Sequence, residues 1–186
     1  AASGMATSWA DLTNELFQGY NGACETPITL ENTGAAISDP YGSGILRTYC
    51  DQVIDLNGHG LSVHGIIVEY GTTLTIEDTS ANGTGTLTTD GSSTGLAGIV
   101  VASGAALDIT GGTVTATGGA NAAAIGGAQN VTDGLDSNRT LDGVGTIAIS
   151  GGTVSATAGS NSAALGGGEG QSGGWVAITN NATVNA

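Results

Sequence analysis

Residues 107–129 read LDITGGTVTATGGANAAAIGGAQ, and residues 147–169 repeat the phrase as IAISGGTVSATAGSNSAALGGGE. A second internal match relates GIIVEYGTTLTIE at 65–77 to GIVVASGAALDIT at 98–110. In all four stretches, short apolar segments alternate with Gly, Asn and Thr, which indicates strands and turns because helical periodicity is absent. The two matches have different offsets along the chain, so the sequence predicts a coil whose successive turns differ in length.

The apolar segments fall in groups of three, which predicts an all-β fold. We expect a right-handed parallel β-helix of about four to five turns, with three short strands in each turn. In this grouping, residues 28–30 begin a turn in the same way as 66–68 and 99–101. The complete set of expected strands is 28–30, 53–56, 61–63, 66–68, 74–76, 86–88, 99–101, 107–109, 113–115, 123–125, 147–149, 153–155, 163–165, 176–178 and 183–185.

One segment, SWADLTNELF at 8–17, has helical spacing instead. Ser8 suits the N-cap position, and Asp11 follows three residues later. Its apolar face consists of Trp9, Leu12, Leu16 and Phe17. We expect this helix to cap the N-terminal end of the solenoid, whose open sheet edges need a cover. The repeat pattern is still running at 183–186, so we expect one β-helix domain over 1–186 that forms the N-terminal part of a longer protein.

The composition narrows the classes of partner. The formal net charge is −14, with Arg47 and Arg139 as the only basic residues besides two histidines and no lysine. Such a chain repels phosphate backbones and anionic lipids, so we expect neither a nucleic-acid partner nor insertion into a membrane. We also expect the domain to be monomeric. We expect Cys24 and Cys50 to form a disulfide rather than a zinc site, the alternative being two buried thiols.

Several phrases carry a family resemblance. They are DLNGHGL at 55–61, GIIVEYGTTLTIEDTSANGTGTLTTDG at 65–91, ISGGTVSATAG at 149–159, AAIGGA at 123–128 and AALGGG at 163–168. Together with the WADL helix, they resemble the pectin-lyase-like β-helix repeat domains of large cell-surface adhesins of Gram-positive bacteria. The resemblance implies a secreted, wall-attached protein that acts as an adhesin or ligand-binding tip. It implies no particular ligand, because such repeats specify fold more than function.

The connections after the first strand of each turn suggest where a ligand binds. They run over 31–52, 69–73, 102–106, 126–146 and 166–175, so two long loops should rise from one edge on either side of a groove about 10 Å wide. Aromatic side chains beside an exposed apolar floor suit a host-surface glycan or protein. The expected ligand-binding residues are Tyr41, Arg47, Tyr49, Ile67, Val100, Asp136, Arg139 and Trp175. The alternative is that the 31–52 loop folds over Ile67 and Val100 as a satellite core.

Other readings of the sequence stay open. The segment at 133–143 offers Asp133, Asp136, Asn138 and Asp142 as oxygen ligands for Ca²⁺, although a solvated loop is the simpler interpretation, and no other cofactor is expected.

A carbohydrate-active enzyme is disfavoured because the outward positions of the second strands (Asp55, Thr75, Asp108, Ala148 and Ala177) hold too few acids. An ice-binding face is the further alternative. Its Thr-x-Thr ladder comprises Thr86, Thr88, Thr113, Thr115, Thr153, Ser155, Thr183 and Asn185.

Overall fold

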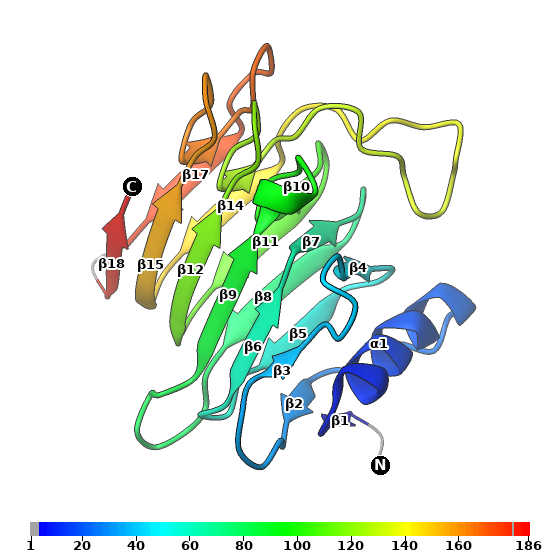
Figure 1. Cartoon of the computed structure of the whole chain (residues 1–186), viewed down its shortest axis with the longest axis vertical. Helices are drawn as coiled ribbons and strands as arrows, with labels where there is room; N and C mark the ends of the chain where they lie inside the picture. The colour runs from blue at the N-terminus through cyan, green and yellow to red at the C-terminus, as the bar shows by residue number, and fades with distance from the viewer. Residues whose placement is uncertain (1–3, 180) are drawn as a thin grey trace.

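A computed structural model describes residues 4–179 and 181–186 (Figure 1). The chain forms a parallel β-helix with three sheets, as its sequence predicts. Sheet A contains β1 (Met5–Ala6), β2 (Ile28–Leu30), β5 (Gln52–Asp55), β8 (Thr73–Glu77), β11 (Ala106–Ile109), β14 (Thr146–Ile149) and β17 (Trp175–Ile178). Sheet B contains β3 (Ile37–Ser38), β6 (Gly60–Val63), β9 (Thr86–Asp90), β12 (Thr113–Thr117), β15 (Gly152–Thr157) and β18 (Ala182–Asn185). Sheet C contains β4 (Ile45–Thr48), β7 (Gly65–Val68), β10 (Ile99–Val101), β13 (Ile125–Gly126) and β16 (Leu165–Gly166).

From β2 onward the chain visits sheets A, B and C in that order, and each strand pairs in parallel with the strand one coil away. Within the described residues, coils starting at β2, β5, β8, β11 and β14 are complete, and β17 and β18 begin another. Every second residue points into the coil. Successive coils therefore stack like on like, as in the row Leu74, Leu107, Ile147 and Val176 of sheet A. This stacking buries a continuous aliphatic core, which is the main source of stability in a solenoid.

The first coil differs from the sequence-based expectation. Residues 28–30 pair with β5 and so belong to sheet A, not to sheet C with β7 and β10. The 31–52 segment is therefore not one long loop, because it contains β3 and β4. These strands escaped detection because β3 has only two residues and β4 carries Arg47 at an outward position, while Pro40 and three glycines surround them.

Glycines shape the corner between sheets A and B. Gly112 and Gly152 have φ values of 80° and 75°, in the left-handed region that glycine enters without a steric cost. The two coils also approach closely there, since a Cβ on Gly152 would lie 2.3 Å from the carbonyl oxygen of Gly112. Backbone geometry therefore explains why both long repeats have a Gly-Gly pair at this corner.

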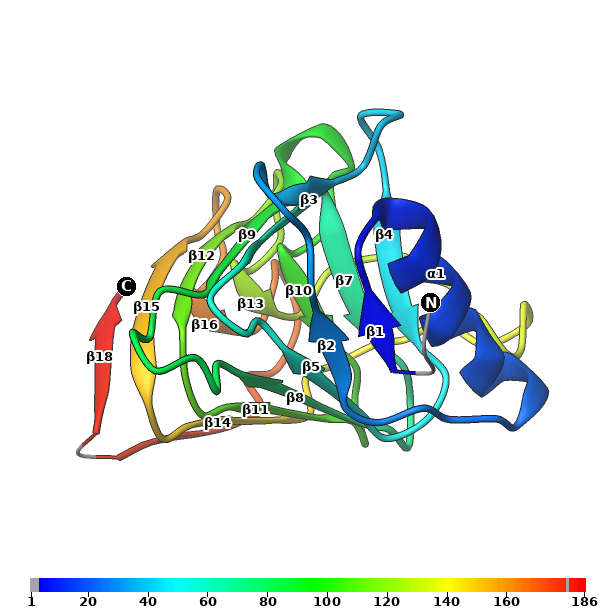
Figure 2. The same cartoon turned by 90° about the horizontal axis from the view of Figure 1, so that it is seen from below.

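Helix α1 (Trp9–Gln18) packs against β1 and β4 at the N-terminal end of the solenoid (Figure 2). The side chain of Ser8 accepts a hydrogen bond from the backbone N–H of Asp11 at 3.2 Å, as the cap prediction requires. Asp11 in turn accepts from the N–H of Thr7 at 3.1 Å, so two free amides at the helix start are satisfied. Leu12 and Leu16 are buried, whereas Phe17, expected on the same buried face, is 50% exposed.

A disulfide joins Cys24 to Cys50, as expected. Cys24 follows the short 3-10 helix η1 (Gly19–Asn21), and Cys50 lies at the corner between β4 and β5. The bond therefore ties the segment after α1 to the end of the first complete coil. A second short 3-10 helix, η2 (Gly91–Ser93), follows β9 at the corner between sheets B and C.

Candidate ligand-binding site

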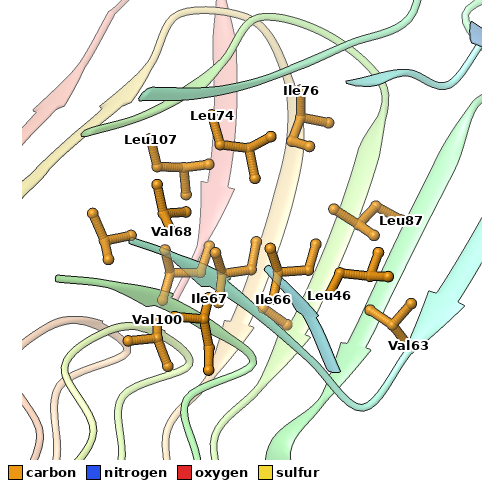
Figure 3. Packing of buried hydrophobic residues seen from close by; sticks show 14 of the residues in the cluster. Leu46, Val63, Ile66, Ile67, Val68, Leu74, Ile76, Leu87, Val100 and Leu107 are labelled. Atoms are coloured by element: carbon orange, nitrogen blue, oxygen red, sulfur yellow. The ribbon is translucent and has the colours of Figure 1, made fainter. Parts of the chain in front are cut away.

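Ile67 and Val100, expected to floor an open groove, are both 1% exposed. They do point outward from sheet C, because β7 pairs with β10 in register and the alternate residues Ile66 and Val68 point inward. Figure 3 shows Leu74 and Leu107 on the inner side of these strands and Val100 on the other side. Both faces of β7 and β10 are therefore buried, and the predicted groove is closed.

The segment that covers the outer face of sheet C is the loop 127–145, between β13 and β14. Val131 and Leu141 of this loop are buried and belong to the same apolar cluster as Ile67 and Val100. In Figure 1 the loop (yellow) leaves its own coil and extends toward the side of the molecule where α1 lies. The satellite core foreseen as an alternative thus exists, but its cover is loop 127–145 instead of residues 31–52.

An ion pair fixes this loop to the coils beneath it. The guanidinium of Arg47 in β4 donates to the carboxylate of Glu69 and also to the carbonyl oxygen of Thr132, at 3.0 Å. Glu69 accepts a further bond from the N–H of Gly134 at 3.1 Å. Burial raises the pKa of Glu69, and the bond from Arg47 opposes that rise. The sequence offered no signal for this pair, which joins residues far apart in the chain.

The other arginine holds the same loop. Arg139 Nε lies 3.4 Å from a carboxylate oxygen of Asp133, and its guanidinium lies 4.9 Å from the ring centre of Tyr70. The second oxygen of Asp133 accepts from the backbone N–H groups of Leu135 and Asp136. Both arginines of this acidic chain therefore stabilise loop 127–145 instead of facing a ligand across a groove.

These contacts also bear on the Ca²⁺ ligands suggested by the sequence. Asp133 is engaged by Arg139 and two amides, and Asp136 accepts from the N–H of Asn138 at 3.0 Å. Asp142 lies elsewhere, in a cleft with Glu169. Among the described residues, no three His, Cys, Asp or Glu side chains come together in a way that could hold a metal ion.

A pocket of about 170 Å³ opens between α1 and β4. Its lining combines apolar and polar side chains, and an aromatic cluster adjoins it. The rings of Phe17 and Tyr20 stack with their centres 5.4 Å apart and an interplanar angle of 11°. Tyr49 meets Tyr20 edge-on at 5.4 Å and Phe17 edge-on at 6.3 Å. The lining consists of Thr13, Leu16, Phe17, Ile45, Leu46, Arg47 and Tyr49.

Polar groups lie at the edge of this pocket. Arg47 lines it while its Nη1 holds loop 127–145, so the guanidinium joins the pocket to that loop. Burial raises the pKa of the Tyr49 hydroxyl, and the charge of Arg47 counteracts part of this rise. The Tyr49 hydroxyl therefore remains protonated at neutral pH and can donate a hydrogen bond. The loop comes close, since a Cβ on Gly134 would lie 3.1 Å from the Tyr49 ring.

Two predicted site residues lie elsewhere. Tyr41 sits in the 39–44 corner between β3 and β4 and is 84% exposed, at a different edge of the coil from loop 127–145. Trp175 begins β17, where it pairs with Thr146 on sheet A. Of the expected set, the structure gathers Arg47 and Tyr49 at the pocket and buries Ile67 and Val100 beneath loop 127–145. Asp136 and Arg139 belong to the covering loop.

A second, polar cleft of about 380 Å³ separates loop 127–145 from the next insertion, residues 167–174. These loops do rise from equivalent corners of adjacent coils, as expected. Side-chain amides join them: Gln129 donates to the carbonyl oxygen of Glu169 at 2.7 Å, and Gln171 donates to that of Ala128 at 3.0 Å. The amides that line this cleft therefore serve mainly to hold its walls together.

Two carboxylates of sheet A lie side by side, because Asp55 pairs in register with Glu77. Burial, followed by the charge of Asp55, raises the pKa of Glu77. Asp55, however, accepts bonds from the N–H groups of Asn57 and Thr79 and from the Thr79 hydroxyl. Three hydrogen bonds from groups of the same corner thus engage both oxygens of Asp55, and this carboxylate stabilises the corner of the coil.

Sequence reasoning missed Phe17 and Tyr20 as site residues. The helical spacing places Phe17 on the apolar face of α1, and Tyr20 lies in η1, which no sequence pattern predicts. The signal that could have found them is the disulfide, which brings the end of α1 next to Tyr49 and Cys50. A Cβ on Gly19 would lie 2.9 Å from the Cys50 sulfur, which shows how closely the two segments approach.

Within the described residues, no helix has the length and apolar character that crossing a bilayer requires. Comparisons of this chain with protein-family models, with curated proteins and with solved structures find no match.

Proposed function

We propose that this chain is a non-catalytic binding module of a secreted bacterial cell-surface protein, and that it binds a neutral glycan at the pocket between α1 and β4. One observation carries the proposal: the exposed, stacked rings of Phe17 and Tyr20 adjoin a pocket whose lining combines aliphatic side chains with Arg47 and Tyr49. A sugar ring presents an apolar C–H face to an aromatic plane and hydroxyls to polar groups at its rim.

The size of the pocket supports this kind of ligand. Pockets that enclose a whole small molecule measure roughly 300–1,000 Å³. At about 170 Å³, this one takes a single substituent of a sugar, while the ring rests on the exposed aromatic surface beside it. A shallow site of this form suits the terminal residue of a glycan chain.

Charge supports a neutral ligand. The chain carries a net charge of −14, and the guanidinium of Arg47 is already paired with Glu69. Long-range repulsion therefore disfavours sulfated or sialylated glycans. The Cys24–Cys50 disulfide suits an oxidising compartment outside the cell, which agrees with the proposed location.

The test is a glycan array, followed by titration of any neutral glycan that binds. Tyr20→Ala and Phe17→Ala each remove an exposed ring and should weaken binding roughly tenfold, about 1.4 kcal/mol, which is within the range of one aromatic contact. Trp175→Ala and Tyr41→Ala are the matched controls, because they remove exposed rings that do not line the pocket and should leave the affinity unchanged. Binding of no neutral glycan, or equal losses in all four variants, would overturn the proposal.

A further inference from the structure

The outward face of sheet B carries a regular array of hydroxyl groups. Thr86, Thr113, Thr153 and Thr183 occupy one row across β9, β12, β15 and β18. The row two residues further along the strands consists of Thr88, Thr115, Ser155 and Asn185. The four strands run side by side and nearly parallel in Figure 1. Every strand pair is in register, so the side chains repeat in two directions without a slip.

Strand geometry sets the spacing of this array. Adjacent coils are about 4.8 Å apart, and alternate residues of one strand are about 6.7 Å apart. Both distances lie in the range of the repeat distances of water oxygens on the surfaces of hexagonal ice. Six of these eight positions are threonine, which adds a methyl group beside its hydroxyl, so each of the six both orders water around an apolar group and hydrogen-bonds to it.

The fold itself does not require this pattern. Sheet A belongs to the same coils and has the same strand spacing, yet its corresponding outward row is irregular, with Val53, Thr75, Asp108, Ala148 and Ala177. In sheet C, β7 and β10 point Ile67 and Val100 outward beneath loop 127–145. The regular hydroxyl array is therefore specific to one face, which loop 127–145 leaves exposed.

The absence of charge on these two rows indicates what kind of ligand the outward face of sheet B can bind. The chain has a net charge of −14, but the two rows contain no ionisable side chain. A third row, at the ends of β9, β12 and β15, has Asp90 followed by Thr117 and Thr157. An uncharged, periodic face on a strongly acidic protein matches an uncharged, periodic surface, and a charged macromolecule would find no partner on it.

We propose that this outward face of sheet B is an ice-binding surface, independent of the aromatic pocket. Its ligand is the ordered water of an ice plane, held by the threonine rows of β9, β12, β15 and β18. The rigid coil supplies the regular spacing, so little conformational entropy is lost when the face binds.

The experiment uses the oxidised, disulfide-bonded chain. Thermal hysteresis, the shape of single ice crystals and partition of the protein into a slowly growing ice hemisphere are measured for the unaltered protein, Thr115→Tyr and Thr75→Tyr. Thr115 lies in the array, and Thr75 is a matched outward threonine of sheet A. Tyrosine suits exposed strand positions, so both variants should fold, and circular dichroism checks this.

The unaltered protein and Thr75→Tyr should shape ice and enter it, and Thr115→Tyr should lose both activities because its ring projects from the plane. Exclusion of the unaltered, folded protein from ice would overturn the proposal. Equal losses in the two variants would overturn it as well. Binding through Thr115 to crystalline cellulose or chitin without any effect on ice would also reject ice as the ligand. Phe17→Ala should retain ice binding, so this proposal and the glycan proposal fail separately.

Discussion

Arg47 and Glu69 form a partly buried ion pair on the outer face of sheet C, and each partner also holds loop 127–145. Arg47 donates to the carbonyl oxygen of Thr132, and Glu69 accepts from the N–H of Gly134. Glu69 is fully buried, whereas the Arg47 side chain remains 27% exposed at the edge of the aromatic pocket. The pair therefore couples the loop that closes sheet C to the candidate ligand-binding site.

Glu69→Ala should lower the free energy of unfolding by about 2 kcal/mol, because it leaves a buried N–H and a partly buried guanidinium without their acceptor. Urea denaturation measures the loss, and limited proteolysis should show earlier cleavage within loop 127–145. Asp142→Ala, which removes an exposed carboxylate from the same loop, is the control and should have little effect. Equal stability of the two variants would show that the ion pair does not hold the loop.

The pH dependence of stability should also trace to Glu69. Burial raises its pKa in the folded chain above the ordinary value of 4.5, so the folded state binds this proton more tightly than the unfolded state. Its contribution to stability is therefore greatest below pH 4.5 and falls as the pH rises through the raised pKa.

Glu69→Gln removes this titration. The unfolding free energy of the unaltered protein minus that of Glu69→Gln should consequently decrease as the pH rises above 4.5. Chemical denaturation at a series of pH values gives this difference. A difference that stays constant, or that increases with pH, would contradict the assignment.

Ile67→Ala tests the burial of the outer face of sheet C. The isoleucine is buried beneath loop 127–145, and truncation of such a side chain typically costs about 2–5 kcal/mol. Thermal or urea unfolding should show a loss in that range. Tyr41→Ala, at a fully solvated corner, should change stability by less than about 0.5 kcal/mol. An equally small effect at Ile67 would mean that the loop does not cover the sheet in solution.

The disulfide offers a further test. Cross-linking residues that lie 26 apart in sequence removes loop-closure entropy from the unfolded chain, worth about 3 kcal/mol. The double variant Cys24→Ser/Cys50→Ser should unfold at a lower urea concentration than the oxidised protein. It should also bind any glycan ligand less tightly, because the bond positions Tyr20 beside Tyr49. Reduction of the unaltered protein should reproduce both effects, whereas the variant should not respond to the reductant.

The sequence by itself determined the features that depend on local geometry and on the repeat. Alternation of apolar residues defined the inward row of each long strand, and left-handed glycines such as Gly112 marked the corners. Ser8 and Asp11 identified the start of the helix, because a cap involves residues only three apart. The hydroxyl rows of sheet B were also readable, because parallel strands in register place repeated residues beside one another.

Only the tertiary structure decided which elements meet across long sequence distances. The continuous apolar runs at 66–68 and 99–101 are typical of strands buried on both faces, whereas the strands of sheets A and B alternate. Which segment covers Ile67 and Val100 nevertheless depended on where loop 127–145 lies in the folded chain. The pairing of Arg47 with Glu69, and of both with that loop, likewise involves no sequence pattern. Residues 28–30 pair with β5 in sheet A. The Cys24–Cys50 disulfide joins the segment after α1 to the corner after β4, where Phe17, Tyr20 and Tyr49 meet. Side-chain packing between distant segments, which no local periodicity encodes, created the candidate site.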